Sequence, residues 1–165
     1  MNESFHVRIA KDDMVFSAGH FITFNGDVCE RLHGHNYRAA VDVHGPLDEN
    51  HYVVDFIALR DILKEITGEL DHHMLLPSEH PQIKVAADEN RVEVTFQDRQ
   101  WIFPRCDCVL LPLANTTTEL LARHIGLRLL DALKERRDVH PELLRIEVDE
   151  CNGQIGVCEL RDKNP

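Results

Sequence analysis

Residues 29–35 read CERLHGH, and this short stretch carries the strongest chemical signal in the chain. His33 and His35 are two positions apart, so on a β-strand their side chains point to the same side. Gly34 between them removes a side chain from the other face and gives the backbone room to bend. The two imidazoles can therefore converge on one metal ion.

A third histidine, His20, ends a second alternating stretch, in which Phe16 and Ala18 fall on the same face. Three histidines with no fourth protein ligand are typical of a catalytic zinc site, whose open position takes water or substrate. Taken alone, His33 and His35 are equally compatible with two interpretations, metal ligands and core histidines. Including His20 favours the interpretation as metal ligands. The other histidines without a usable spacing are predicted to lie on the surface or in loops: His6, His44, His51, His80, His124 and His140.

Two further places in the sequence offer groups that move protons. Cys29 lies four residues before His33, and a thiol near a divalent cation has a lowered pKa and can act as a base. Inert packing is the alternative for a lone cysteine. Asp71 precedes His72 just after an expected helix, and an acidic residue beside a histidine can orient the imidazole or share its proton. Ordinary surface contacts at a helix end are the alternative for this pair.

Glu150 is a carboxylate on an apolar strand face. It alternates with Ile146 and Val148, so its side chain should point toward the core. A buried carboxylate needs a partner. The partner could be an internal arginine, or it could be a ligand with a guanidine-like donor pair, such as a pterin ring, which a carboxylate accepts in bidentate fashion.

Hydrophobic periodicity gives the order strand, strand, helix, helix, strand, strand. The predicted segments are a long bent strand over 5–20, a strand over 33–43, helices over 56–70 and 116–133, and strands over 146–150 and 155–160. Thr116 and Glu119 predict a capping box at the start of the second helix. Alternation around 92–103 predicts a hairpin within an insertion at about 82–110.

This order predicts one α+β domain over residues 1–165, with two helices on one face of a four-stranded antiparallel sheet. Such a sheet has two open edges, and unpaired edges favour association with other strands.

Bulk properties exclude several function classes. The chain has 165 residues, 43% of them hydrophobic, and a formal net charge of −11. This charge disfavours nucleic acid and anionic membranes as partners. No apolar run long enough for a transmembrane helix or a signal peptide is present. Five irregularly spaced cysteines indicate reduced thiols in a cytoplasmic protein.

Taken together, the motifs resemble those of the 6-pyruvoyl-tetrahydropterin synthase / 6-carboxy-tetrahydropterin synthase family. They occur in the same order as in the family and span nearly the whole chain. They are residues 16–20 (FSAGH), Cys29, residues 33–37 (HGHNY), 53–56 (VVDF), 70–72 (LDH), 117–119 (TTE) and 148–150 (VDE).

The resemblance implies a fold and a set of roles. The fold would be the T-fold (tunnelling fold), in which three subunits join their sheets edge to edge into a barrel and two trimers stack into a hexamer. The implied roles, by position in this chain, are zinc ligation by His20, His33 and His35, catalysis by Cys29 with Asp71 and His72, and substrate binding by Glu150, Thr117 and Thr118. Sites of the family lie between subunits, so Asp71 and His72 would serve a neighbour's Cys29.

The activity implied is zinc-dependent conversion of 7,8-dihydroneopterin triphosphate to 6-carboxy-5,6,7,8-tetrahydropterin, a precursor in queuosine synthesis. The short gap between Cys29 and His33 resembles the 6-carboxy enzymes, whereas the 6-pyruvoyl enzymes usually have a longer gap. A 6-pyruvoyl-tetrahydropterin synthase is the first alternative. Glu30 resembles a glutamate with which other members cleave the side chain to 6-hydroxymethyl-7,8-dihydropterin for folate synthesis, so a dual activity is an alternative. A solvated loop carboxylate is the other interpretation of Glu30. A non-catalytic pterin- or zinc-binding relative and a three-histidine zinc hydrolase are the remaining hypotheses, and Glu150 argues against the hydrolase.

Overall fold

One long strand, β5 (His33–Gly45), organises the sheet of the computed structural model, which describes residues 2–161. β1 (Phe5–Ile9) and β2 (Val15–His20) pair along one edge of β5, and β11 (Leu143–Asp149) pairs along the other, all antiparallel. β12 (Ile155–Arg161) continues the sheet beyond β11, also antiparallel. The predicted antiparallel core of the sheet is therefore confirmed.

The predicted single strand over residues 5–20 is wrong in one respect, because the chain divides there into β1 and β2. The residues between them form a turn in which the Met14 N–H donates to the Lys11 carbonyl at 3.1 Å. The Met14 side chain is buried, which anchors the turn against the core. Both strands still follow the same edge of β5.

The sheet is also larger than predicted, and it is mixed. β6 (His73–Pro77) pairs parallel with β2, and β10 (Cys108–Leu111) pairs parallel with β6. The resulting order is β10-β6-β2-β5-β11-β12, with β1 on β5. The two additional strands are short apolar runs, which periodicity alone cannot separate from other buried segments.

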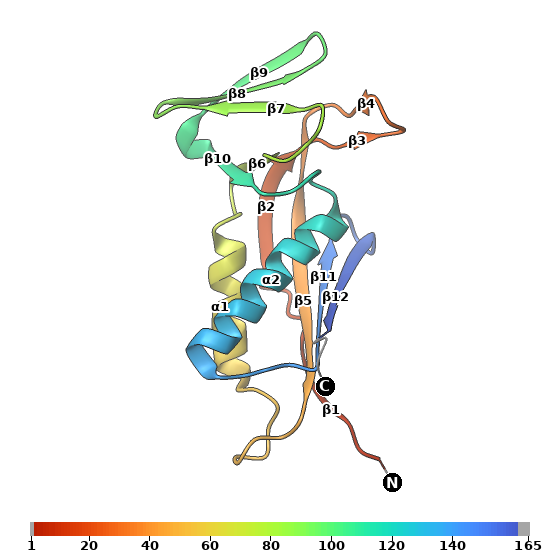
Figure 1. The fold of residues 1–165 in the computed structure, drawn as a ribbon, viewed down its shortest axis with the longest axis vertical. Coiled ribbons are helices and arrows are strands. Elements are labelled where there is room, and N and C mark those ends of the chain that lie inside the picture. Colours follow the sequence, from red (N-terminus) through yellow and green to blue (C-terminus); the bar gives the residue numbers. More distant parts are fainter. Residues whose placement is uncertain (1, 162–165) are drawn as a thin grey trace.

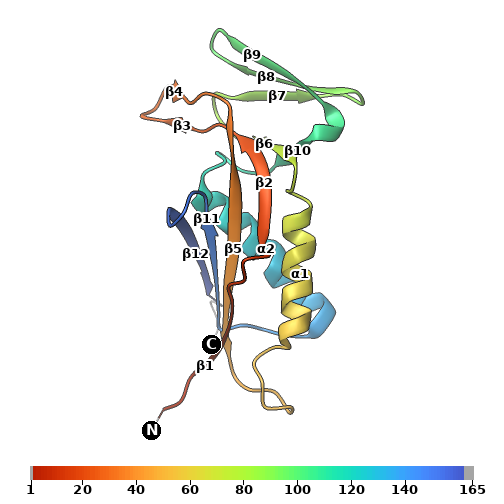
Figure 2. The same ribbon diagram turned by 180° about the vertical axis from the view of Figure 1, so that it is seen from behind.

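Two helices cover one face of this sheet (Figures 1 and 2), as predicted. α1 (Phe56–Gly68) begins at Asp55, whose side chain accepts a hydrogen bond from the Ala58 N–H. α2 (Thr118–Arg137) begins at Thr117, which makes no side-chain cap. The predicted capping box is wrong, because the Thr116 hydroxyl is buried and donates to the Phe21 carbonyl instead.

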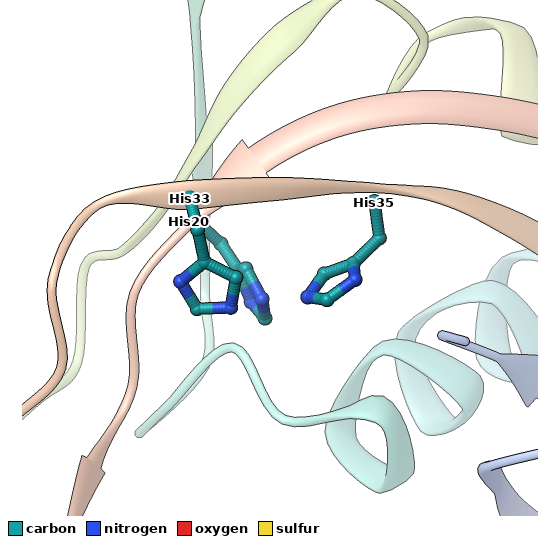
Figure 3. A group of neighbouring side chains, drawn as sticks. All are labelled: His20, His33 and His35. Atoms are coloured by element: carbon teal, nitrogen blue, oxygen red, sulfur yellow. The ribbon is translucent and has the colours of Figure 1, made fainter.

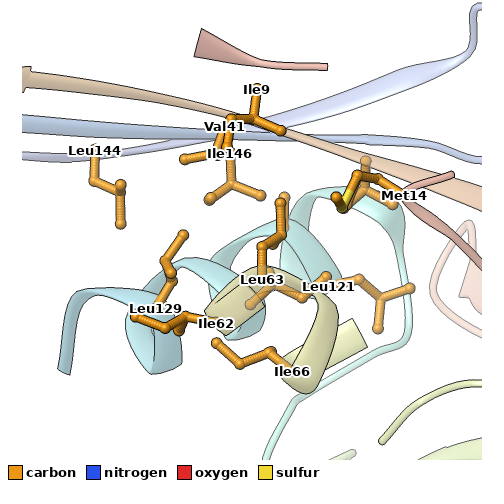
Figure 4. Packing of buried hydrophobic residues seen from close by; sticks show 14 of the residues in the cluster. Ile9, Met14, Val41, Ile62, Leu63, Ile66, Leu121, Leu129, Leu144 and Ile146 are labelled. Carbon is orange, nitrogen blue, oxygen red and sulfur yellow. The ribbon is translucent and has the colours of Figure 1, made fainter. Parts of the chain in front are cut away.

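The main core lies between the helices and the sheet. Figure 4 shows Leu63 of α1 and Leu121 of α2 facing Val41 and Ile146 of the sheet. All four side chains are fully buried. Within residues 2–161, neither helix combines the length and the apolar character needed to cross a membrane.

The segment predicted to be an insertion, at about 82–110, forms a small sheet of its own, which we call the inserted sheet. It has three antiparallel strands in place of the predicted hairpin: β7 (Lys84–Ala87), β8 (Arg91–Phe96) and β9 (Arg99–Pro104). A 3-10 turn (Arg105–Asp107) then leads into β10. This sheet lies across one end of the main sheet, at the same end as the hairpin β3 (Thr23–Phe24) and β4 (Val28–Cys29) (Figure 1).

A second hydrophobic cluster fills the space beneath the inserted sheet. It joins side chains of the insertion to the ends of β2 and β6. Its buried members are Phe21, Met74, Leu76, Ile83, Val92, Val94, Phe96 and Cys108. The insertion is therefore packed against the end of the main sheet where β2 finishes and β5 begins.

Candidate metal centre and active site

Three imidazoles meet where β2 ends and β5 begins (Figure 3). His20 is the last residue of β2 and pairs with His33, while His35 lies two residues further along β5. One ring nitrogen from each histidine can be chosen so that all three lie within 4.8 Å of one another. Antiparallel pairing places the three residues side by side, and strand alternation turns all three rings to one face.

Hydrogen bonds fix the tautomers of two of these rings. The Nδ1 atom of His20 lies 3.0 Å from the Thr116 carbonyl, and the Nδ1 atom of His33 lies 2.8 Å from the Arg31 carbonyl. A carbonyl only accepts, so both Nδ1 atoms carry the proton and both Nε2 atoms keep a free lone pair. Metal-binding histidines are commonly oriented in this way.

The free nitrogens fit a metal ion. Among residues 2–161, the buried side-chain polar atoms without a hydrogen-bond partner are His20 Nε2, His35 Nε2 and the Tyr37 hydroxyl. Leaving such atoms unpaired costs about 1–3 kcal/mol each, and a cation between the rings would satisfy both nitrogens. Burial lowers the pKa of His20 to about 4. This ring is therefore neutral at physiological pH, which is the form that binds metals.

A carboxylate borders the imidazoles. Glu150 follows the last residue of β11, and its Oε1 atom lies 3.3 Å from His20 Nε2 and 3.6 Å from His35 Nε2. The Tyr37 ring lies edge-on to both of these histidines. Burial, reinforced by the charge of Glu150, raises the pKa of Tyr37. Strand alternation places Tyr37 on the same face as His33 and His35, although its sequence position alone indicates no role at the site.

Cys29 and Glu30 are adjacent but face different surroundings. Glu30 Oε2 lies 3.9 Å from His33 Nε2 and accepts a hydrogen bond from the Ile22 N–H at 3.4 Å. The Cys29 side chain packs against the second hydrophobic cluster. Burial raises the pKa of this thiol, against the opposing charge of Arg99. The carboxylate therefore lies beside His33, while the thiol contacts apolar side chains.

Asp71 and His72 form a hydrogen-bonded pair. Asp71 Oδ2 lies 2.8 Å from His72 Nδ1, and its other oxygen accepts the Ser17 N–H at 2.7 Å. That backbone bond, followed by the contact with His72, lowers the pKa of Asp71. The His72 backbone is left-handed, with φ of 58°, a conformation that costs energy outside glycine.

This pair does not face the three imidazoles within one chain. His72 lines a pocket of about 520 Å³ together with Ser17 and Asn36, and His35 also borders this pocket. Ser17 and Asn36 alternate with the histidines of β2 and β5, so their side chains lie on the opposite face of the sheet. The structure therefore separates the Asp71–His72 pair from the His20, His33 and His35 cluster.

Thr117 and Thr118 stand at the N-terminus of α2, directly after the Thr116 carbonyl that holds His20. Thr118 is closely packed: a Cβ atom placed on Gly156 of β12 would lie 2.6 Å from it. The two threonines therefore lie on the segment that also fixes one candidate ligand.

His80 lies in a loop, as predicted, and its side chain is buried there. Its Nδ1 atom accepts the N–H groups of Gln82 and Ile83, and its Nε2 atom lies 2.7 Å from the Thr23 hydroxyl. Asn115 contacts the Thr23 backbone from the other side. These residues fix the hairpin that leads to Cys29, and no local sequence pattern indicates it.

Comparisons with known proteins agree on one family. The family model described as 6-pyruvoyl tetrahydropterin synthase matches residues 8–160. A protein of Methanocaldococcus jannaschii, which carries the provisional name 6-carboxy-5,6,7,8-tetrahydropterin synthase, is 31% identical over 144 residues, covering 87% of each chain. The 6-pyruvoyl tetrahydropterin synthase of Plasmodium falciparum superposes with a TM-score of 0.89 at 29% identity, covering 98% of this chain and 100% of that one. The Plasmodium vivax synthase gives 0.88 at 25% identity with the same coverage.

Proposed function

The chain belongs to the 6-pyruvoyl tetrahydropterin synthase family, and from this we propose that it is a zinc-dependent lyase that converts 7,8-dihydroneopterin triphosphate to 6-carboxy-5,6,7,8-tetrahydropterin. The observation that carries the proposal is the cluster of three imidazoles with a carboxylate beside it. The name of the archaeal relative supports the 6-carboxy product. That product would serve queuosine synthesis. Incubating the purified protein with this substrate and identifying the pterin product by chromatography tests the assignment.

His20, His33 and His35 would hold the zinc through their Nε2 atoms. When bound, zinc supplies Lewis-acid polarisation of the side-chain hydroxyls of the substrate. The Thr116 and Arg31 carbonyls keep two of these rings in the ligating tautomer. All five cysteines are free thiols, which fits a reducing compartment such as the cytoplasm.

Glu150 would anchor the pterin ring. The ring offers an N–H and an amino group side by side, and a carboxylate accepts such a pair in bidentate fashion. Thr117 and Thr118 would contact the substrate from the start of α2, where the backbone N–H groups have no partner within the helix. Together these residues would position the side chain of the substrate over the imidazoles.

The anchor can be tested with Glu150→Gln. An amide accepts one hydrogen bond but lacks the charge, so we expect pterin affinity to fall about 10–100-fold, corresponding to roughly 1.5–3 kcal/mol for a charged hydrogen bond. Zinc content should stay the same. Fluorescence titration with a pterin and elemental analysis measure the two effects, with Glu159→Gln on exposed β12 as the matched control. Unchanged pterin affinity would remove the anchor, and lost zinc would make Glu150 a metal ligand.

Cys29 would move protons on the substrate side chain, in relay with Asp71 and His72. Asp71 holds the Nδ1 side of His72, which leaves the Nε2 side for the reaction. Because this pair lies on the sheet face opposite the three imidazoles, we propose that it acts in a neighbouring subunit. A trimeric barrel, doubled into a hexamer, would bring the two faces together.

Mixed oligomers test this shared site. Cys29→Ala and His72→Ala subunits are each expected to be inactive alone. When the two are co-assembled at random in equal amounts, about a quarter of the wild-type activity should return. The reason is that one site in four then receives an intact Cys29 from one subunit and an intact His72 from its neighbour. Pairing Cys29→Ala with His33→Ala is the control, because both residues come from the same side of the site and no intact site can form. Equal activity in the two mixtures would place Asp71 and His72 outside a shared site.

A second activity is favoured by the position of Glu30. Its carboxylate lies 3.9 Å from His33 Nε2, whereas the Cys29 thiol packs in an apolar cluster. A carboxylate base here could take the proton of the C2′ hydroxyl of the substrate side chain, so that the C1′–C2′ bond breaks. C2′ would leave as an aldehyde that carries the triphosphate, and the electron pair left on C1′ would take up a proton. This reaction would release 6-hydroxymethyl-7,8-dihydropterin, so we propose side-chain cleavage as the second candidate function.

A further inference from the structure

An arginine of the inserted sheet bonds the loop that carries Cys29 and Glu30. Arg99, the first residue of β9, donates from Nη1 to the Cys29 carbonyl at 2.8 Å and from Nη2 to the Glu30 carbonyl at 2.9 Å. Both bonds are partly buried. One guanidinium therefore binds two consecutive carbonyls, and these belong to the two residues whose catalytic roles are in question.

This contact requires a bend in the loop. Consecutive carbonyls of an extended strand point in opposite directions, so two of them can reach one guanidinium only where the chain leaves the strand. β4 ends at Cys29, and the Glu30 N–H returns to the Ile22 carbonyl at 3.0 Å. The bend lies at the point where the side chains of Cys29 and Glu30 separate.

The guanidinium is itself held in place. Its central carbon lies 4.6 Å from the centre of the Trp101 ring, within the range of a cation–π contact. Trp101 stacks on Phe21, with ring centres 4.6 Å apart and an angle of 19° between the ring planes. Phe21 is buried and directly follows His20. A continuous stack thus connects the loop to the strand end that carries a candidate metal ligand.

We propose that Arg99 is a positioning residue: by bonding both carbonyls it holds the bend at Cys29 and Glu30, and so fixes where the thiol and the carboxylate lie relative to the imidazole cluster. This gives the insertion a role in the site, because β9 carries both Arg99 and Trp101. The kinetic part of the proposal rests on the proposed function, while the effect on the loop does not.

We call the two hydrogen bonds from Arg99 to the Cys29 and Glu30 carbonyls the clamp. Arg99→Lys and Arg99→Ala test it, with Arg91→Lys and Arg91→Ala as controls. Arg91 lies on neighbouring β8 and pairs with Asp88, away from the loop. Lysine keeps the charge but cannot bind two carbonyls as a planar fork or stack in the same way. We expect two rates to rise about tenfold or more in both Arg99 variants: amide hydrogen exchange in residues 22–33, and alkylation of Cys29, which peptide mass locates. The reason is that each variant loses two charge-assisted hydrogen bonds. The Arg91 variants should match the wild type.

Measurements of kcat and KM distinguish a positioning role of Arg99 from a role in stability alone. With zinc content kept, kcat of the Arg99 variants should fall about tenfold or more while KM changes little, the pattern of a lost transition-state interaction. Millimolar guanidinium chloride should restore part of kcat in Arg99→Ala and should leave kcat of Arg91→Ala unchanged. Unchanged exchange and alkylation would overturn the clamp, and a normal kcat with a loosened loop would overturn its positioning role. If the wild type does not turn over the pterin, the proposed function fails, and exchange and alkylation still decide the clamp.

Discussion

His33→Ala and His35→Ala are each expected to lose the metal almost completely while the fold is kept. Each change removes one of three imidazoles that converge within 4.8 Å. Loss of an outer-shell partner alone typically lowers metal affinity by about 10–100-fold, so loss of a ligand should cost at least as much. Elemental analysis should fall from about one zinc per chain, the stoichiometry of a three-histidine site, to near zero.

The fold should survive because neither side chain belongs to the main core. His33 is exposed and His35 is half-buried, whereas Tyr37 on the same strand is fully buried. Circular dichroism would verify the fold. His44→Ala is the matched control, since His44 lies on the same strand at an even position and stacks on His6 on the other face. Full zinc retention in both ligand variants would remove the metal centre as assigned.

Cys29→Ala and Glu30→Ala should have separable effects on the products. We expect Cys29→Ala to abolish the 6-carboxy product, by the factor of about 10²–10⁴ that a positioned base contributes, with zinc and pterin still bound. Glu30→Ala should spare that product and remove any 6-hydroxymethyl product. Burial raises the pKa of Cys29 in the metal-free chain, and a nearby cation would favour the thiolate.

Chromatographic quantification of the pterins from wild type and both variants decides between the two bases. Cys106→Ala is the control, because Cys106 is an exposed thiol on the turn after the inserted sheet. If Cys29→Ala forms the 6-carboxy product at the wild-type rate, the thiol is not the base. Loss of both products in Glu30→Ala would then assign the chemistry to the carboxylate, which lies 3.9 Å from His33 Nε2.

The cluster of three histidines could be predicted from local pattern because strand alternation is a short-range rule. Spacing by two residues is enough to place His33 and His35 on one face, and the alternation of Phe16, Ala18 and His20 adds the third ring. The two helices and the antiparallel core follow from the same periodicities. Each of these inferences needs only a few consecutive residues.

The surroundings of the cluster were decided by the tertiary structure. Arg99 reaches the Cys29 carbonyl across 70 residues of sequence, and His80 reaches Thr23 across 57. The parallel pairing of β6 with β10 likewise depends on where distant segments meet. Such contacts produce no periodic pattern of residues in the sequence, because they are determined by packing and by the need to pair buried polar groups. The sequence thus places the ligands, and the folded chain determines which way Cys29 and Glu30 face.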